Sequence, residues 1–153
     1  MQHTRRALKL VMDHETGSSV AIQLAGQRPY IGYGHYENPV QYQPIAQMTA
    51  EALLDHDLAI WDVEMRARID NQMTQAQWDA VCDWHHAFQT PTIARDFIYE
   101  HINHGNYAGA ICVMIAHLGP HRMTEERLWA RRARWLELWA TQDVRKLPPG
   151  LEQ

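Results

Sequence analysis

The stretch from residue 14 to residue 36, HETGSSVAIQLAGQRPYIGYGHY, decides how this chain folds. Apolar side chains alternate with other residues at Val20, Ile22 and Leu24, and a turn-like Ala-Gly-Gln-Arg-Pro segment leads to an aromatic, β-prone end. This pattern predicts a small antiparallel hairpin or a three-stranded sheet, within a β-containing lobe at about 18–45.

A helix is expected immediately upstream, from about Thr4 to Glu15. Leu8, Val11 and Met12 recur on one face at helical spacing, and Glu15 continues the same apolar stripe. An isolated buried charge is too costly to tolerate, so this carboxylate needs either a partner or an exit to water.

The chain beyond this lobe has the period of helices. Thr74 and Gln77 form a capping box. The helix that they open carries an apolar stripe and is expected to be central. The expected helices run from Thr49 to near Asn71, from Thr74 to before Pro91, from Thr92 to Gly105, from Tyr107 to Gly119, and from Thr124 onward. The predicted fold class is α+β and mostly helical.

Length and composition favour one compact domain. The chain has 153 residues, 46% of them hydrophobic and 21% charged, with a net charge of -4. We expect a single domain over 1–147, with a helical lobe at about 49–141 and a flexible tail at 148–153. Such a charge gives no general attraction to nucleic acid, and no apolar run is long enough for a membrane span. Cys82 and Cys112 are expected to be buried free thiols.

The last helix places a second charge on an apolar line. Leu128, Arg132, Trp135 and Trp139 follow the spacing i, i+4, i+7, i+11. We hypothesise that Arg132 forms an ion pair with Glu15 in a cleft. Two alternatives stay open: the arginine could extend along the tryptophans to water, and the glutamate could be exposed at its helix end.

These residues belong to a longer series of anchors that resembles the phage-type lysozymes, glycoside hydrolase family 24. The anchors are Glu15, the string Tyr-Ile-Gly-Tyr-Gly-His ending at His35, the segments 48–52 and 75–80, Phe88-Gln89, 104–107, and Leu128 followed by Arg131-Arg132. They extend from about residue 8 to 139. The resemblance implies a lysozyme-like fold, with a glycan strand of peptidoglycan lying between a small N-terminal β-lobe and a C-terminal helical lobe.

The resemblance also implies roles for individual residues. Glu15 matches the catalytic acid of the family, and Arg132 matches the arginine that pairs with it. Tyr36 and Phe88 match positions that line the cleft, and Tyr30 is a third candidate substrate contact.

Two positions depart from the family pattern. Where the family has an aspartate and a threonine, this chain has Leu24 and Tyr30. Glycoside hydrolysis needs an acid and a second group that activates or positions water. Gln23 is a candidate that could orient water without deprotonating it, and Ser18 or Ser19 could do so more weakly.

Glu37 is the stronger chemical substitute for the missing carboxylate. It follows the Gly-His turn, and a hairpin there could direct it into the cleft. The string His-Glu-Thr-Gly at 14–17, with this second glutamate 22 residues after Glu15, also resembles the paired acids of family 19 chitinase-like enzymes.

The predicted function is that of an endolysin, a muramidase that hydrolyses the β-1,4 bond between N-acetylmuramic acid and N-acetylglucosamine. The alternative is a catalytically silent lysozyme-fold protein that binds glycan or a protein partner. No motif for a cofactor or a metal is present, so none is expected. The expected partner is bacterial peptidoglycan, without nucleic acid or stable membrane insertion, and a monomer is expected. We expect the protein in the host cytoplasm, from which a holin or an injection system would carry it to the periplasm.

Overall fold

The computed structural model describes residues 1–23, 28–39, 44–89, 93–117 and 124–140. Its elements, in chain order, are α1 (Arg5–His14), β1 (Ser18–Ile22), β2 (Tyr30–Gly32), α2 (Gln47–Arg68), α3 (Gln75–Phe88), α4 (Ile93–Asn103), α5 (Tyr107–Ala116) and α6 (Glu125–Ala140). The predicted fold class, α+β and mostly helical, is confirmed. Among the described helices, none combines the length and the apolar character needed to cross a membrane.

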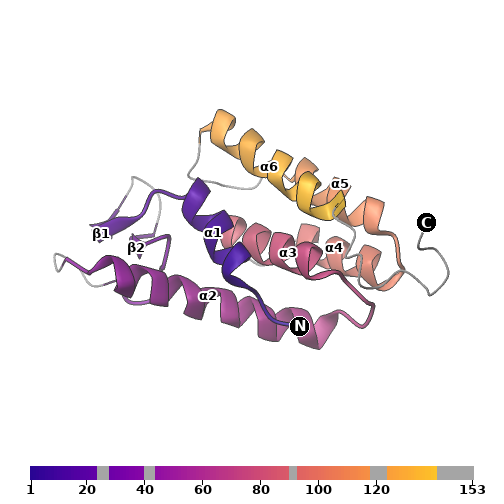
Figure 1. Ribbon diagram of the computed structural model, residues 1–153, viewed down its shortest axis with the longest axis horizontal. Coiled ribbons are helices and arrows are strands. Elements are labelled where there is room, and N and C mark those ends of the chain that lie inside the picture. The colour runs from indigo at the N-terminus through magenta and orange to yellow at the C-terminus, as the bar shows by residue number, and fades with distance from the viewer. Residues whose placement is uncertain (24–27, 40–43, 90–92, 118–123, 141–153) are drawn as a thin grey trace, which may run out of the picture.

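Helix α3 is the centre of the helical lobe. It packs against α1, α2 and α6, and Figure 1 shows it between α2 at the bottom of the view and α6 at the top. The predicted capping box is confirmed, since the Thr74 hydroxyl accepts from the Gln77 backbone N–H at 3.1 Å and the Gln77 side chain accepts from the Thr74 N–H at 2.9 Å. All five residues of its predicted stripe are buried: Trp78, Val81, Cys82, His85 and Phe88.

The β-lobe is a two-stranded antiparallel hairpin within the described residues. β1 pairs with β2, and an isolated bridge joins Ile31 to His35. Figure 1 shows the hairpin beside the N-terminal half of α2, where Gly32 brings its backbone close to the helix. A Cβ at Gly32 would lie 3.4 Å from the Cα of Ala50, and its φ of +62° also favours glycine.

Several helix ends differ slightly from those expected. α2 begins at Gln47 instead of Thr49 and ends at Arg68, with Ile69 as its C-terminal cap. α4 is followed by Gly105 at a φ of +70°, the left-handed conformation that ends many helices. The expected tail at 148–153 lies outside the described residues.

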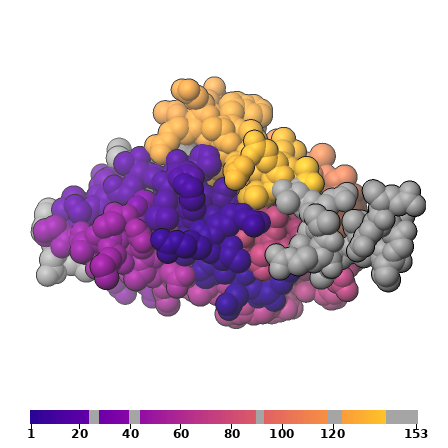
Figure 2. Space-filling view, in the orientation of Figure 1, coloured from indigo at the N-terminus to yellow at the C-terminus, as the bar shows by residue number. Residues whose placement is uncertain are grey.

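The two cysteines occupy different environments. Cys82 is fully buried in α3, as expected, but Cys112 is exposed on α5, so its predicted burial is wrong. Its neighbours Ile111 and Met114 face the core, which turns the cysteine outward. In the space-filling view, α1 lies across the front of the molecule and α6 forms a ridge along the top (Figure 2).

Candidate active site

Glu15 lies where the chain leaves α1 for the β-lobe. It is the C-terminal cap of the helix, with its backbone N–H donating to the Val11 carbonyl at 2.7 Å and its own dihedral angles already extended. The residue is 8% exposed. Glu15 is therefore held at the junction of the two lobes and is largely buried there.

An arginine from the last helix binds this carboxylate. Arg131 Nη1 donates to Glu15 Oε1 at 2.8 Å, and Arg131 Nε and Nη2 donate to the two carboxylate oxygens of Asp83 at 2.8 and 2.6 Å. Asp83 also accepts from the Trp135 indole N–H at 2.6 Å. Arg131 and Asp83 are both fully buried, so α6 and α3 share one ionic network that ends on Glu15.

The predicted pairing of Glu15 with Arg132 is wrong. Arg132 is buried too, but its Nη2 donates to the backbone carbonyl of His117 at 2.8 Å, and its guanidinium lies 4.7 Å from the ring centre of Trp129. Adjacent residues of a helix point about 100° apart. The neighbouring arginine therefore faces α5 and its end, whereas Arg131 faces α3 and α1.

The sequence did contain a signal for the correct residue. Leu128, Arg131, Trp135 and Leu138 follow the spacing i, i+3, i+7, i+10, which describes a helix face as well as the stripe through Arg132 does. All four are 5% exposed or less, whereas Trp139 is only partly buried. The buried face of α6 thus includes both arginines, but its centre lies closer to Arg131 than to Arg132.

The electrostatics of this network favour a charged arginine. Burial opposes its charge, but the carboxylates of Asp83 and Glu15 outweigh that effect and raise the pKa of Arg131. Nearby, burial lowers the pKa of His86, against the opposing attraction of Glu15. The His86 Nε2 atom lies 2.7 Å from the Tyr33 carbonyl oxygen, consistent with a neutral imidazole that donates to the β-lobe.

Two further contacts hold the segment after Glu15. Arg127 on α6 donates through Nη1 to the Thr16 hydroxyl at 2.9 Å. At Gly17, an added Cβ would lie 2.9 Å from the ring of Tyr33, so the absence of a side chain lets the ring approach the backbone. The turn out of α1 is therefore fixed from both lobes.

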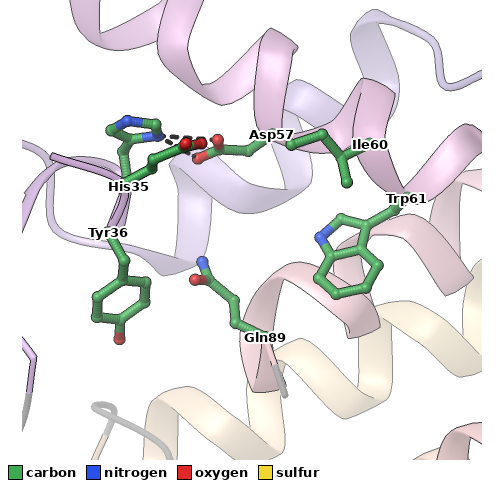
Figure 3. Close-up of a pocket in the computed structure, with 7 residues that line it drawn as sticks. His35, Tyr36, Asp57, Ile60, Trp61 and Gln89 are labelled. Atoms are coloured by element: carbon green, nitrogen blue, oxygen red, sulfur yellow. Dashed lines mark hydrogen bonds and ion pairs between the residues drawn. The ribbon is translucent and has the colours of Figure 1, made fainter. Parts of the chain in front are cut away.

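A hollow of about 150 Å³ lies between the β-lobe and the helices (Figure 3). The residues that line it are His35, Tyr36, Glu37, Asp57, Ile60, Trp61 and Gln89. His35 Nδ1 lies 2.8 and 3.1 Å from the carboxylate oxygens of Asp57 on α2, which ties the hairpin to that helix.

The two candidates for the second catalytic group are both exposed. Glu37 is two residues after His35 and lines the hollow, and Gln23 directly follows β1. Ser18 and Ser19 are the first two residues of β1. Leu24, which occupies the family's aspartate position, lies outside the described residues.

The three predicted substrate contacts differ in exposure. Tyr36 lines the hollow and its ring lies 6.1 Å from that of Tyr30, which is 8% exposed. The prediction that Phe88 contacts substrate is wrong, because this residue is 4% exposed and packs against Trp84 and Trp135 in the core. The end of α3 turns this ring inward, so it offers almost no surface to a glycan.

Metal binding finds no support in the described parts of the chain. No group of three or more histidine, cysteine, aspartate or glutamate side chains is placed there to hold an ion. His85 and His86, adjacent in sequence, instead bond to Tyr99 and to the Tyr33 carbonyl.

Comparison with known proteins identifies the family. Residues 12–148 match the phage lysozyme family. The chain belongs to the phage lysozyme family. It is 29% identical over 110 residues to an endolysin of Acyrthosiphon pisum secondary endosymbiont phage 1, a match that covers 72% of this chain and 75% of that protein. The expected class, a lysozyme-type glycosidase acting on peptidoglycan, is confirmed by this membership.

Solved structures support the lysozyme fold. The muramidase domain of SpmX from Asticaccaulis excentricus superposes with a TM-score of 0.75 at 24% identity, over 92% of this chain and all of that one. A mutant of P22 lysozyme gives 0.74 at 20% identity, over 92% of this chain and 99% of that one. The predicted lysozyme-like architecture is therefore confirmed.

Proposed function

We propose that this phage lysozyme cleaves the β-1,4 bond between N-acetylmuramic acid and N-acetylglucosamine, with Glu15 as its general acid. The observation that carries the proposal is the 2.8 Å bond from fully buried Arg131 to the carboxylate of Glu15, a residue that is 8% exposed. A general acid must be held in a fixed place and must also be reachable by the substrate.

The chemistry follows from this arrangement. Protonated Glu15 donates its proton to the glycosidic oxygen while the bond from that oxygen to the anomeric carbon breaks. Arg131 then compensates the negative charge that remains on the carboxylate. Water adds to the anomeric carbon from the other face and loses its proton to a second group.

Glu37 is our candidate for that second group. It lies two residues after His35, whose side chain pairs with Asp57, and its side chain is exposed at the hollow. In an inverting enzyme the two carboxyl groups lie ~6.5–9.5 Å apart, which leaves room for the water. Gln23 remains the competitor, because an amide could position water without removing its proton.

The decisive experiment compares wild type with Glu15→Gln in a turbidity assay on outer-membrane-permeabilised Gram-negative cells. Glutamine has nearly the same shape but cannot donate this proton, and loss of a general acid typically costs ~10²–10⁴ in rate. Glu126→Gln, at an exposed position in the first turn of α6, is the matched control and should clear like wild type.

Each outcome of this assay has a distinct meaning. Equal clearing by wild type and Glu15→Gln would remove Glu15 from the mechanism. Clearing by none of the proteins would favour the silent alternative. That alternative is suggested by Leu24 and Tyr30, which occupy the positions where the family has an aspartate and a threonine. If wild type is active, a rate reduction of at least tenfold in Glu37→Gln, but not in Gln23→Ala, would identify the base.

We further propose that the enzyme acts as a monomer and reaches the wall from the host cytoplasm through a holin or an injection system. Expression without any such route should leave host cells intact, and permeabilisation of the inner membrane should then start lysis. Lysis without permeabilisation would contradict this route.

A further inference from the structure

His86 is a buried polar residue that the proposed acid and base leave without a role. It lies in the last turn of the central helix α3, and its side chain is fully buried. An apolar ring would fill the same space without the cost of removing an imidazole from water. The presence of a histidine here therefore points to a partner that only a polar ring can bind.

That partner is a turn of the β-lobe. Tyr33 and Gly34 form the turn that follows β2. His86 Nε2 lies 2.7 Å from the Tyr33 carbonyl oxygen, and Gln89 Nε2 donates to the Gly34 carbonyl at 3.1 Å. Two consecutive carbonyls of the turn are thus bound by two side chains at the C-terminal end of α3.

The contacts of the two ring nitrogens define one tautomer of His86. A carbonyl oxygen only accepts, so Nε2 carries the hydrogen. Nδ1 lies 3.5 Å from the amide nitrogen of Gln89, which only donates, so Nδ1 is the acceptor. Burial lowers the pKa of His86, in agreement with a neutral ring. An imidazolium would direct a second N–H at the Gln89 amide and would add a cation near Arg131.

The backbone of Gln89 also indicates that its side chain has a role. Gln89 caps α3 with a φ of +41°, in the left-handed region where glycine commonly ends a helix. A side chain in this conformation is strained, and a glycine would lack the amide that binds the turn. Figure 3 shows the Gln89 amide directed away from the end of α3. The helix therefore ends on a strained residue whose side chain holds the β-lobe.

The turn that His86 binds also contacts the segment after Glu15. An added Cβ at Gly17 would lie 2.9 Å from the ring of Tyr33, so this ring packs directly against the backbone. Glu15 lies two residues earlier, and its charge opposes the lowering of the His86 pKa, as expected for a nearby carboxylate. A continuous series of contacts thus runs from His86 through Tyr33 to the backbone next to Glu15.

We propose that His86 is a positioning residue for the reaction. Its neutral ring holds Tyr33 against Gly17 and thereby fixes the backbone that presents Glu15 to the glycosidic oxygen. Arg131 holds the carboxylate itself from α6, so the acid is fixed at both its side chain and its backbone. This inference rests on the proposed function, since it concerns the residue that places the proposed acid.

Variants at His86 test this role by kinetics. His86→Leu removes the donor to the Tyr33 carbonyl, and we expect kcat to fall roughly tenfold while KM stays within about twofold. KM should change little because the pair between His35 and Asp57 still holds the side of the β-lobe that lines the hollow. His86→Gln can bring an amide N–H close to the position of Nε2 and should recover most of the lost kcat. Turbidity assays over a range of cell concentrations give both constants.

The matched control is His85→Leu, the same change one residue earlier. His85 bonds to Tyr99 of α4 instead of the β-lobe, so this variant should lose stability and keep the kcat of wild type. Wild-type kcat in a folded His86→Leu protein would overturn the positioning role. Equal losses of kcat in the two leucine variants, or no recovery in His86→Gln, would overturn it as well.

A measurement on the wild-type protein covers the case in which a leucine variant does not fold. Long-range ¹H–¹⁵N correlation spectra of ¹⁵N-labelled protein distinguish the two neutral tautomers of a histidine from each other and from the imidazolium. We expect His86 in the Nε2–H form at about pH 7. An Nδ1–H form or an imidazolium would contradict the bond to Tyr33 and overturn the inference.

The backbone amide spectrum separates this inference from the proposed mechanism. The Gly17 amide signal should shift in His86→Leu and stay in place in His85→Leu, whatever the role of Glu15. If Glu15→Gln clears cells and the Gly17 signal shifts only in His86→Leu, the acid assignment fails and the placement of this segment by His86 stands. If Glu15→Gln is inactive but His86→Leu leaves both kcat and the Gly17 signal unchanged, the positioning role fails and the acid stands.

Discussion

Both ends of α1 are tied to the helical lobe through buried aspartates, but only one end carries the proposed general acid. At the N-terminal end, Asp62 accepts from the Trp78 indole at 2.7 Å and from the His3 backbone N–H at 2.8 Å. Asp79 accepts from the backbone N–H and the hydroxyl of Thr4 at 3.0 and 2.7 Å. These carboxylates bind groups of the fold itself.

The C-terminal end repeats the pairing of an aspartate with a tryptophan. Asp83 accepts from the Trp135 indole at 2.6 Å, as Asp62 does from Trp78. Its second partner, Arg131, continues the network to Glu15, a residue that is 8% exposed.

The difference between the two ends shows that a buried aspartate bound to a tryptophan indole can serve two purposes. A buried carboxylate is tolerated only when its hydrogen bonds are made, and both aspartates meet that condition. At the N-terminal end the network closes within the fold and contributes stability. At the other end the network continues to a carboxylate at the junction between the lobes, so the same arrangement also positions the group that we propose as the general acid.

The largest expected effect comes from breaking the C-terminal network with Arg131→Met. The substitution leaves Asp83 buried without its cation, and breaking such a pair typically costs about 3–5 kcal/mol of unfolding free energy. Glu15 also loses its anchor, so lysis should fall with stability. Urea denaturation and the turbidity assay measure the two effects, and a loss under 1 kcal/mol would contradict the proposed network.

A smaller effect, confined to stability, is expected from Asp62→Asn. The His3 backbone N–H and the Trp78 indole both donate to Oδ1, so the amide nitrogen replaces Oδ2, and the His3 ring, whose Nδ1 lies 2.6 Å from Oδ2, loses its carboxylate partner at a cost of about 2 kcal/mol. Lysis per folded molecule should stay within twofold of wild type, since Asp62 lies at the other end of α1. A large loss of specific activity would show that the two ends of the helix are coupled.

The stability of the fold should also depend on pH through its buried histidines. Burial lowers the pKa of His85 to about 3, so in acid the unfolded chain takes up a proton that the folded chain excludes. The contribution of neutral His85 to the free energy of unfolding is full above about pH 6.5. It is lost as the pH falls toward 3, by about 1.4 kcal/mol per pH unit. His3 acts in the other direction and at higher pH: burial opposes its charge, but Asp55 and Asp62 outweigh that and raise its pKa.

Urea titrations between pH 4.5 and 6 measure this slope. His85→Gln should flatten it by about 1.4 kcal/mol per pH unit, since one buried titrating group is removed. Tyr99→Phe is the control, because it removes the hydrogen bond to His85 and leaves the imidazole in place, so its slope should match that of wild type. Equal slopes for wild type and His85→Gln would show that His85 titrates alike in both states.

Local patterns predicted the fold well because each can be read within a few residues. The capping box at Thr74 and the apolar stripe of α3 depend on spacing alone, and both are confirmed. The ties of the N-terminal segment to Asp62 and Asp79 join residues 59 and 75 positions apart, and no local period indicates such contacts.

The site was predictable as residue types and less so as geometry. Glu15 stood out because its charge interrupts an apolar stripe, and the structure does bury it. The choice between Arg131 and Arg132 depends on about 100° of helix rotation, which a stripe of mixed leucines and tryptophans fixes poorly. Phe88 failed as a cleft residue because the direction of a helix-end ring is set by tertiary packing.

The smallest expected effect comes from Arg132→Met, the neighbour of the first substitution. Arg132 binds a backbone carbonyl and the Trp129 ring instead of a buried carboxylate, and burial alone lowers its pKa. Methionine keeps an apolar stem of similar length and leaves no buried charge behind, so the loss should stay near ~1 kcal/mol, mostly for the His117 carbonyl. Lysis should remain within threefold of wild type.

Because Arg131→Met and Arg132→Met make the same chemical change one residue apart, the difference between their unfolding free energies measures what the ionic network adds. If the two losses were equal, or if Arg132→Met abolished lysis, the assignment of Arg131 as the partner of Glu15 would have to be withdrawn.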